Sequence, residues 1–233
     1  PRLNGKSYIS HNKFILKLER GRPVSVWTGG MNFSEGGIFG HSNVAHVVNN
    51  PAIAERYARY WEVLRSDPEN GPMKKQVEEI TPAFALPLQE EETVVFSPRT
   101  GLEVLENYAG MARSARHALF MTFAFGMNEE FKKVYQTART PLRYALMEKA
   151  CMAGKDREKF EREKKEIEAI RRKKENVFAI GNTIRTNCFD GWLRERLTGL
   201  NSNVKYIHNK FMLIDPLGRN PIVVTGSANF SVA

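Results

Sequence analysis

Cysteines and long apolar runs are scarce in this chain of 233 residues. Its two cysteines, Cys151 and Cys188, are too few for a disulfide framework or a cysteine-rich zinc site. The longest nearly apolar stretch, Ala118–Phe125, is much shorter than the ~18 residues that a membrane-spanning helix needs. These absences exclude a disulfide-stapled miniprotein and a helical membrane channel. The hydrophobic content of 42% excludes a disordered chain.

Positive charge exceeds negative charge, with 35 lysines and arginines against 26 acidic residues and a formal net charge of +9. Such a surplus favours anionic partners, namely nucleic acid, phospholipid headgroups or phosphate esters. Many soluble proteins are equally basic, so charge alone does not choose a partner. The chain has no initiator methionine and stops directly after a strand-like segment. We therefore expect it to be a piece of a longer protein.

Strand-like and helix-like segments alternate along most of the chain, which predicts an α/β fold. We expect a first lobe over residues 1–65, a linker over 66–92 and a second lobe over 93–233. The linker is expected because residues 66–92 contain four prolines and many polar residues. The expected strands are Ile9–Leu18, Val24–Thr28, Asn43–Val48, Val94–Ser97, Ala118–Phe125, Val177–Gly181, Val204–Asp215 and Ile222–Gly226. The expected helices are Pro51–Arg65, Leu102–Arg116, Glu129–Thr137, Lys155–Glu175 and Phe189–Leu197, while Leu142–Met147 fits a strand or a helical turn.

An internal repeat is the strongest signal in the sequence. His11–Ser34 and His208–Ser231 align without a gap and share 13 of 24 residues. Both copies contain His-Asn-Lys-Phe, a Gly-Arg turn and a Thr-Gly-x-x-Asn-Phe-Ser ending. Two copies in register, 197 residues apart, predict two equivalent structural units that carry the same chemistry.

Alternation of side chains along a strand sorts the repeated residues by face. It places His11 with Lys13, and His208 with Lys210, on one face of each strand. Asp215 lies an odd number of positions from His208, so a straight strand directs it away from the imidazole. We interpret Asp215 as an orienting or structural anion rather than a general base.

The late asparagines, Asn32 and Asn229, add an amide to each histidine and lysine. Two such sets facing one another would surround a phosphodiester with cations and hydrogen-bond donors. One histidine could attack phosphorus while the other protonates the leaving oxygen, because histidine changes charge near neutral pH. This chemistry requires no metal and no cofactor.

The repeated residues resemble the signature of the phospholipase D superfamily, which is His-x-Lys, four residues and Asp, followed by Gly-Ser-x-Asn. The second copy matches it at His208, Lys210, Asp215, Gly226, Ser227 and Asn229. The first copy matches at His11, Lys13, Gly29 and Asn32. It has Leu18 in place of the aspartate and Gly30 in place of the serine. The pattern is most similar to bacterial phospholipase D-like proteins that carry two such domains on one chain.

This resemblance implies a two-lobed α/β/α sandwich with a pseudo-twofold repeat, as a monomer that contains an internal pseudo-dimer. It implies a metal-independent phosphodiesterase that hydrolyses or transfers phospholipid headgroups through a covalent phosphohistidine. It also implies that His11 is the nucleophile and His208 the acid. The acidic residue that such enzymes usually carry past the second motif would be missing, because the chain ends at Ala233.

Two alternative functions remain open from the sequence. One is a nuclease that applies the same chemistry to DNA or RNA, which the basic charge would suit. The other is a catalytically lapsed module that binds anions, suggested by Leu18 and the incomplete ends. His41, in a glycine-rich loop after the first motif, is a further candidate for the site. No His, Cys and Asp cluster has the spacing of a zinc site.

Overall fold

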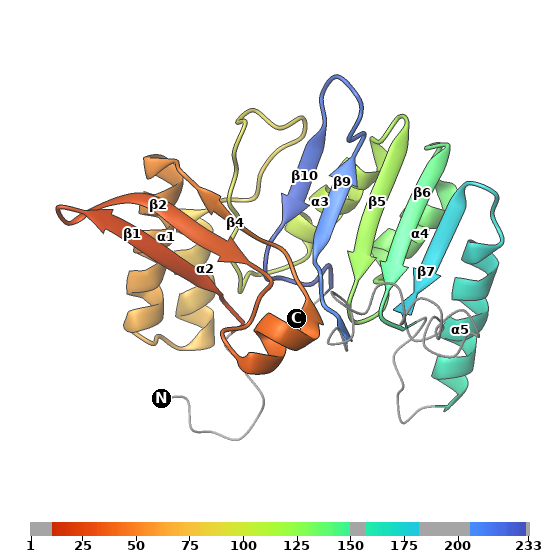
Figure 1. The fold of residues 1–233 in the computed structure, drawn as a ribbon, viewed down its shortest axis with the longest axis horizontal. Coiled ribbons are helices and arrows are strands. Elements are labelled where there is room, and N and C mark those ends of the chain that lie inside the picture. The colour runs from red at the N-terminus through yellow and green to blue at the C-terminus, as the bar shows by residue number, and fades with distance from the viewer. Residues whose placement is uncertain (1–10, 150–156, 182–205, 232–233) are drawn as a thin grey trace.

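The computed structural model describes residues 11–149, 157–181 and 206–231. These residues form two main β-sheets that lie side by side, with helices packed against each (Figure 1). The mixed α/β class expected from the sequence is confirmed. Cys151, Cys188 and the helix expected at Phe189–Leu197 lie outside the described residues.

The first sheet is antiparallel and has the spatial order β1-β2-β4. It comprises β1 (Phe14–Glu19), β2 (Arg22–Gly29) and β4 (Ala45–Val48). Two helices, α1 (Pro51–Arg65) and α2 (Asn70–Ile80), pack on it through a shared apolar core. Helix α1 begins where the Asn50 side chain accepts the backbone N–H groups of Ala52 and Ile53, as expected for an N-cap residue.

Helix α2 occupies much of the stretch expected to be a linker. Its residues Met73, Val77 and Ile80 are buried together with Val26 of β2 and with Phe96. Their spacing of four and then three residues places them on one helical face. The prolines suggested a linker, but two of them, at positions 68 and 72, lie just before the helix or in its first turn, where proline is tolerated.

The strand expected at Val94–Ser97 belongs to none of the sheets in the described parts of the chain. Phe96 instead donates its backbone N–H to the Thr81 hydroxyl, 3.1 Å away, and its ring stacks on Tyr60 at 4.2 Å between centroids. This segment therefore closes the core of the first sheet.

The second sheet has the spatial order β10-β9-β5-β6-β7. It comprises β5 (Ala118–Phe123), β6 (Leu142–Met147), β7 (Asn176–Ile180), β9 (Phe211–Ile214) and β10 (Ile222–Thr225). The strands β5, β6 and β7 are parallel, whereas β9 is antiparallel to both β5 and β10. The associated helices are α3 (Glu103–Arg113), α4 (Glu129–Thr137) and α5 (Arg157–Arg171). Crossover helices thus connect the parallel strands, as the alternating pattern predicted.

A short parallel ladder joins the two halves of the chain. It pairs β3 (His41–Ser42), which follows the π-helix η1 (Gly36–Gly40), with β8 (Tyr206–Ile207). The strand expected over Val204–Asp215 is therefore interrupted, because β8 ends at Ile207 and β9 begins at Phe211. At the interruption the Thr122 hydroxyl donates to the Asn209 carbonyl and accepts the Phe211 N–H.

Candidate active site

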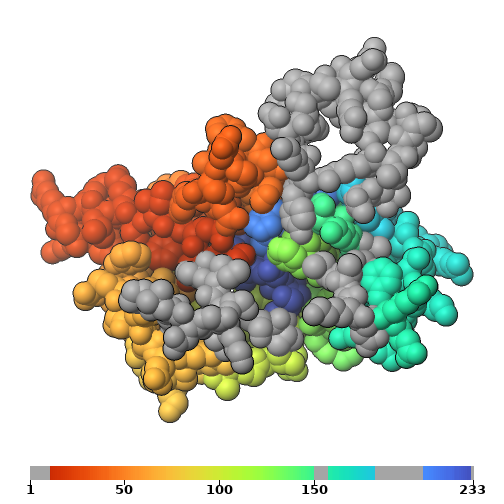
Figure 2. Space-filling view, turned by 90° about the horizontal axis from the view of Figure 1, so that it is seen from below, coloured from red at the N-terminus to blue at the C-terminus, as the bar shows by residue number. Residues whose placement is uncertain are grey.

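The two repeated histidines meet between the two sheets. His11 lies just before β1 and His208 just before β9, and their ring centroids are 6.4 Å apart. His208 is 5% exposed, whereas His11 is half-buried. Seen from below, blue residues near the C-terminus lie recessed between the orange segment around η1 and green residues of the second half (Figure 2). The fold thus brings together two motifs that are 197 positions apart in the sequence.

The two lysines are held in the same way in both copies. Lys13 Nζ donates to the carbonyl of His11 at 2.6 Å, and Lys210 Nζ donates to the carbonyl of His208 at 2.7 Å. Both lysines are buried, and the ring centroid of Phe125 lies 5.6 Å from Lys210 Nζ. An ammonium group has three donors, so each lysine can also bind an anion while it keeps its carbonyl contact.

Burial and mutual repulsion lower the pKa values of all four groups. Burial, followed by repulsion from Lys13, lowers the pKa of Lys210 to about 7. Burial, followed by repulsion from Lys210 and weaker repulsion from His41, His11 and Lys13, lowers the pKa of His208 to about 4. The pKa values of His11 and Lys13 are lowered as well, in both cases chiefly by burial.

No carboxylate of the described residues forms a salt bridge with either lysine. Within the described residues these buried cations have no counter-ion, an arrangement that is costly and that a bound anion would relieve. The site is therefore electrostatically suited to a phosphate or another oxyanion.

The glycine and serine positions of the two motifs contact the opposite copy. The backbone carbonyl of Ser227 accepts a hydrogen bond from the His11 ring, which opposes the lowering of its pKa. A Cβ atom added to Gly30 would lie 3.5 Å from the Gly226 carbonyl oxygen and 3.3 Å from Asn43 Oδ1. The first copy has glycine where the signature has serine, and an added Cβ would be in near-ordinary contact with these atoms.

The two motif asparagines have different surroundings. Asn229 Oδ1 is buried, and no hydrogen bond to it is formed within the described parts of the chain. Asn32 begins the loop that leads to η1, and Gly37 approaches its backbone so closely that an added Cβ would lie 2.5 Å from the Asn32 carbonyl oxygen. An unpaired buried acceptor, such as Asn229 Oδ1, is a candidate contact for a donor on a ligand.

Asp215 lies at the far end of β9, separated from His208 by the length of the strand. Its carboxylate accepts the backbone N–H groups of Arg116, His117 and Ala118 at 2.7–2.9 Å. It thereby ties the β9–β10 turn to the start of β5. The corresponding Leu18 of the first hairpin is exposed and has no such contacts available, because its side chain is apolar.

Two residues from β3 and its flank, His41 and Asn43, lie beside His208. The His41 ring lies 5.3 Å from the His208 ring between centroids, so the candidate from the glycine-rich loop does approach the site. Asn43 was missed by sequence reasoning, although its Oδ1 lies 2.9 Å from His208 Nδ1. The only signal was a polar His-Ser-Asn run between a glycine-rich loop and a strand, from which the histidine alone was singled out.

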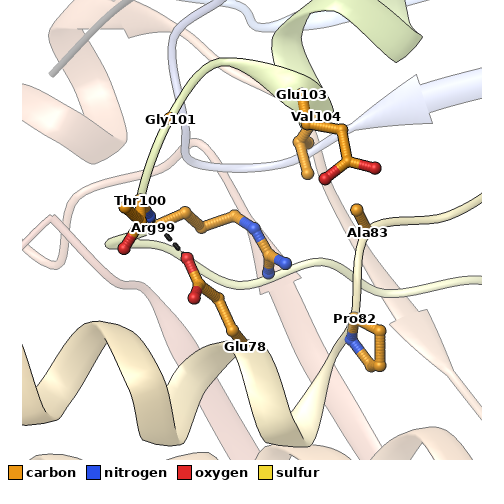
Figure 3. A pocket seen from close by; sticks show the side chains of 8 residues that line it. All are labelled: Glu78, Pro82, Ala83, Arg99, Thr100, Gly101, Glu103 and Val104. Atoms are coloured by element: carbon orange, nitrogen blue, oxygen red, sulfur yellow. Dashed lines mark hydrogen bonds between the residues drawn. The ribbon is translucent and has the colours of Figure 1, made fainter.

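A separate open pocket lies between α2 and the segment that leads into α3 (Figure 3). The Glu78 carboxylate there accepts the backbone N–H of Thr100. The pocket is lined by Glu78, Pro82, Ala83, Arg99, Thr100, Gly101, Glu103 and Val104. None of the repeated motif residues lines it, so this pocket is separate from the histidine site.

The described residues contain no group of three or more His, Cys, Asp or Glu side chains arranged to hold a metal ion. None of the helices within them is both long and apolar enough to cross a bilayer.

Comparison with known proteins places the fold but not the activity. No family model matches the chain, and no curated protein matches it in sequence. Among solved structures it is similar to the polyphosphate kinase from Porphyromonas gingivalis, with a TM-score of 0.51 and 13% sequence identity. The match covers 94% of this chain and 30% of the kinase chain. The chain therefore has an α/β fold like that of one part of a larger phosphoryl-transfer enzyme, at an identity that supports the fold alone.

Proposed function

We propose that the chain is a metal-independent phosphodiesterase of the phospholipase D type. The observation that carries this proposal is the facing pair of His-x-Lys motifs, with imidazole rings 6.4 Å apart beside two buried lysines. The repeated sequence and the likeness of the fold to that of a polyphosphate kinase support it. None of these observations would support the function as well by itself, because a single His-x-Lys motif is common and one fold hosts many activities.

The proposed reaction has two displacement steps at phosphorus. One histidine nitrogen bonds to phosphorus while the bond to the leaving oxygen breaks, and the other histidine, as imidazolium, gives that oxygen a proton. The second histidine, now neutral, then takes a proton from water as the water oxygen displaces the first imidazole. Lys13 and Lys210 bind the non-bridging oxygens, and the bound negative charge raises their lowered pKa values toward the charged form.

We also propose that the two sheets with their helices are the two lobes of a pseudo-twofold sandwich within one chain. The core contacts of Met73, Val77 and Phe96 favour a first lobe that extends beyond residue 65 to about Phe96. The second lobe would then begin in the segment that leads into α3. In this arrangement each lobe supplies one histidine, one lysine and one asparagine.

The substrate class is an anionic phosphodiester, and phospholipid headgroups are the leading candidate. Nucleic acid is the alternative that the net charge of +9 favours. The name of the structurally similar kinase adds polyphosphate as a third compound to test. A module that only binds anions would leave all three intact.

The decisive experiment is hydrolysis of bis(p-nitrophenyl) phosphate in buffer with EDTA by the chain and its His11→Ala and His208→Ala variants. Each variant should lose ~10³-fold or more of kcat, because both histidines act in the same displacement. The matched control is His117→Ala, since the exposed His117 side chain lies near Asp215 at the far end of β9 from His208. It should keep full activity.

Three results would count against the proposal. Activity that is lost with EDTA and restored by zinc would replace the phosphohistidine mechanism. Unchanged turnover in either histidine variant would remove that residue from the chemistry. A folded chain that binds phosphate but turns over neither the surrogate nor phospholipid, DNA, RNA or polyphosphate would be the binding module.

A further inference from the structure

The Asn43 amide is held at both of its ends. Its Nδ2 donates to the Gly37 carbonyl at 3.0 Å, and its Oδ1 lies 2.9 Å from His208 Nδ1. Turning the amide over would place its oxygen against the Gly37 carbonyl oxygen, where two acceptors would repel. The Gly37 contact therefore directs an acceptor at His208, and His208 Nδ1 must be the donor.

The backbone around this contact is fixed from both halves of the chain. The His208 N–H donates to the Ser42 carbonyl at 3.2 Å, and β3 pairs with β8 immediately before it. On the other side of β8, the buried Glu148 carboxylate accepts the Ile207 N–H at 2.8 Å. The Asn43 side chain thus meets a histidine whose own backbone is anchored.

We propose that Asn43 is a positioning residue that holds neutral His208 as the Nδ1-protonated tautomer, so that Nε2 of His208, rather than His11, is the nucleophile. This inference rests on the proposed function. It reverses the roles that the family resemblance implied for the two histidines. A neutral imidazole carries one ring proton, so a proton fixed on Nδ1 leaves the lone pair on Nε2.

The charges around His208 favour the same assignment. Lys210, Lys13, His11 and His41 all oppose a positive charge on its ring, and burial acts in the same direction. A carboxylate in the place of Asn43 would stabilise the imidazolium, whereas an amide oxygen accepts a hydrogen bond from Nδ1–H without adding negative charge. The neutral ring is the form that attacks.

In the resulting reaction the His208 Nε2–phosphorus bond forms as the bond to the leaving oxygen breaks. The electron pair of that bond leaves with the oxygen, and the His11 imidazolium supplies its proton. The Ser227 carbonyl accepts a hydrogen bond from the His11 ring and partly offsets the lowering of the His11 pKa by burial and by the two lysines. Water then attacks phosphorus, gives its proton to His11 and releases His208.

The tautomer can be measured without turnover, by long-range ¹H–¹⁵N spectra of the chain labelled in histidine. At neutral pH the His208 signals should show a protonated Nδ1 and an unprotonated Nε2, and His208→Gln assigns them. A protonated Nε2 in the neutral form would overturn the proposal. Because this measurement does not depend on catalysis, a chain without turnover would count against the proposed function alone.

The Asn43→Asp variant tests whether the lack of a negative charge beside His208 matters. The new carboxylate should raise the pKa of His208 by about 1–3 units, as an opposite charge at this distance does. The acid limb of the pH profile of kcat/KM should move to higher pH by the same amount, because the neutral nucleophile then exists only at higher pH. The matched control, Asn220→Asp, adds the same charge in the exposed β9–β10 turn and should leave the limb in place.

The phosphorylated residue identifies the nucleophile directly. Mass spectrometry after an alkaline quench during turnover should find phosphate on His208 in the unaltered chain. Phosphate on His11 instead, or an acid limb that stays in place in Asn43→Asp while the variant remains folded, would overturn the assignment.

Discussion

At the scale of single residues, Asp215 shows how a motif residue acts by supporting the hairpin instead of reacting. Burial raises the pKa of its carboxyl. The hydrogen bonds from the N–H groups of Arg116, Ala118 and His117 lower that pKa by more, so the net change is a decrease. Its backbone φ of 45° lies in the left-handed region, which asparagine and aspartate tolerate better than most residues. Asp215→Asn keeps this conformation and an acceptor oxygen for His117 and Ala118, but it removes the charge and the oxygen that accepts from Arg116. It therefore isolates the contribution of the charge to these hydrogen bonds.

We predict that Asp215→Asn lowers the free energy of unfolding at neutral pH by about 2 kcal/mol, the scale of hydrogen bonds to a charged group. The folded-state pKa is lowered, so the stabilisation is present above the unfolded-state pKa of about 3.9 and disappears as pH falls through the folded-state value. Urea unfolding between pH 7 and pH 3 should show the two proteins converging at the acid end. A constant difference across that range would contradict this account.

The repeated histidines and lysines could be predicted to share a site because the two copies are visible in the sequence itself. Asn43 could not, because its role depends on the pairing of β3 with β8, from distant parts of the chain. The spacing also predicted one strand through His208 and Lys210, whereas the backbone there bonds to Ser42 and Thr122 instead. Contacts of this kind have no local signature.

At the scale of elements, α2 decides whether residues 66–92 are a connection or part of a core. Val77 is fully buried against the residues of α1, β2 and Phe96. We predict that Val77→Ala lowers the free energy of unfolding by about 2 kcal/mol, through lost apolar burial and the cavity left behind. Lys75→Ala, on the exposed face of the same helix, should change it by less than about 0.5 kcal/mol. Equal unfolding midpoints for both variants in urea would mean that α2 does not stabilise the lobe.

The elements predicted correctly were those whose residues carry a local pattern, such as a capping residue and an apolar stripe. Helix α1 was expected at Pro51–Arg65 and lies there, because its cap and apolar stripe are both local. Strand β6 was ambiguous, since Leu142–Met147 is too short for periodicity to choose between a strand and a helical turn. Pairing with β5 and β7 settled it. The α2 segment was assigned to a linker because its prolines outweighed a short buried stripe.

At the scale of the whole molecule, the net charge of +9 and the buried cations of the site act over different distances. Salt screens exposed charges over about 10 Å at 0.1 M, but it screens buried groups much less. We therefore predict that raising NaCl from about 20 mM to about 500 mM lowers kcat/KM for a polyanionic substrate by roughly 3–10-fold, while kcat changes little.

The measurement is a set of full Michaelis curves at each salt concentration, with DNA and a singly charged diester compared side by side. The singly charged diester should lose less, because long-range attraction grows with the charge of the substrate. Unfolding midpoints at the same salt concentrations separate screening from loss of structure. A decrease confined to kcat would place the effect of salt on the buried lysines themselves. The net charge would then contribute nothing to substrate capture, and the argument for a nucleic acid substrate would lose its support.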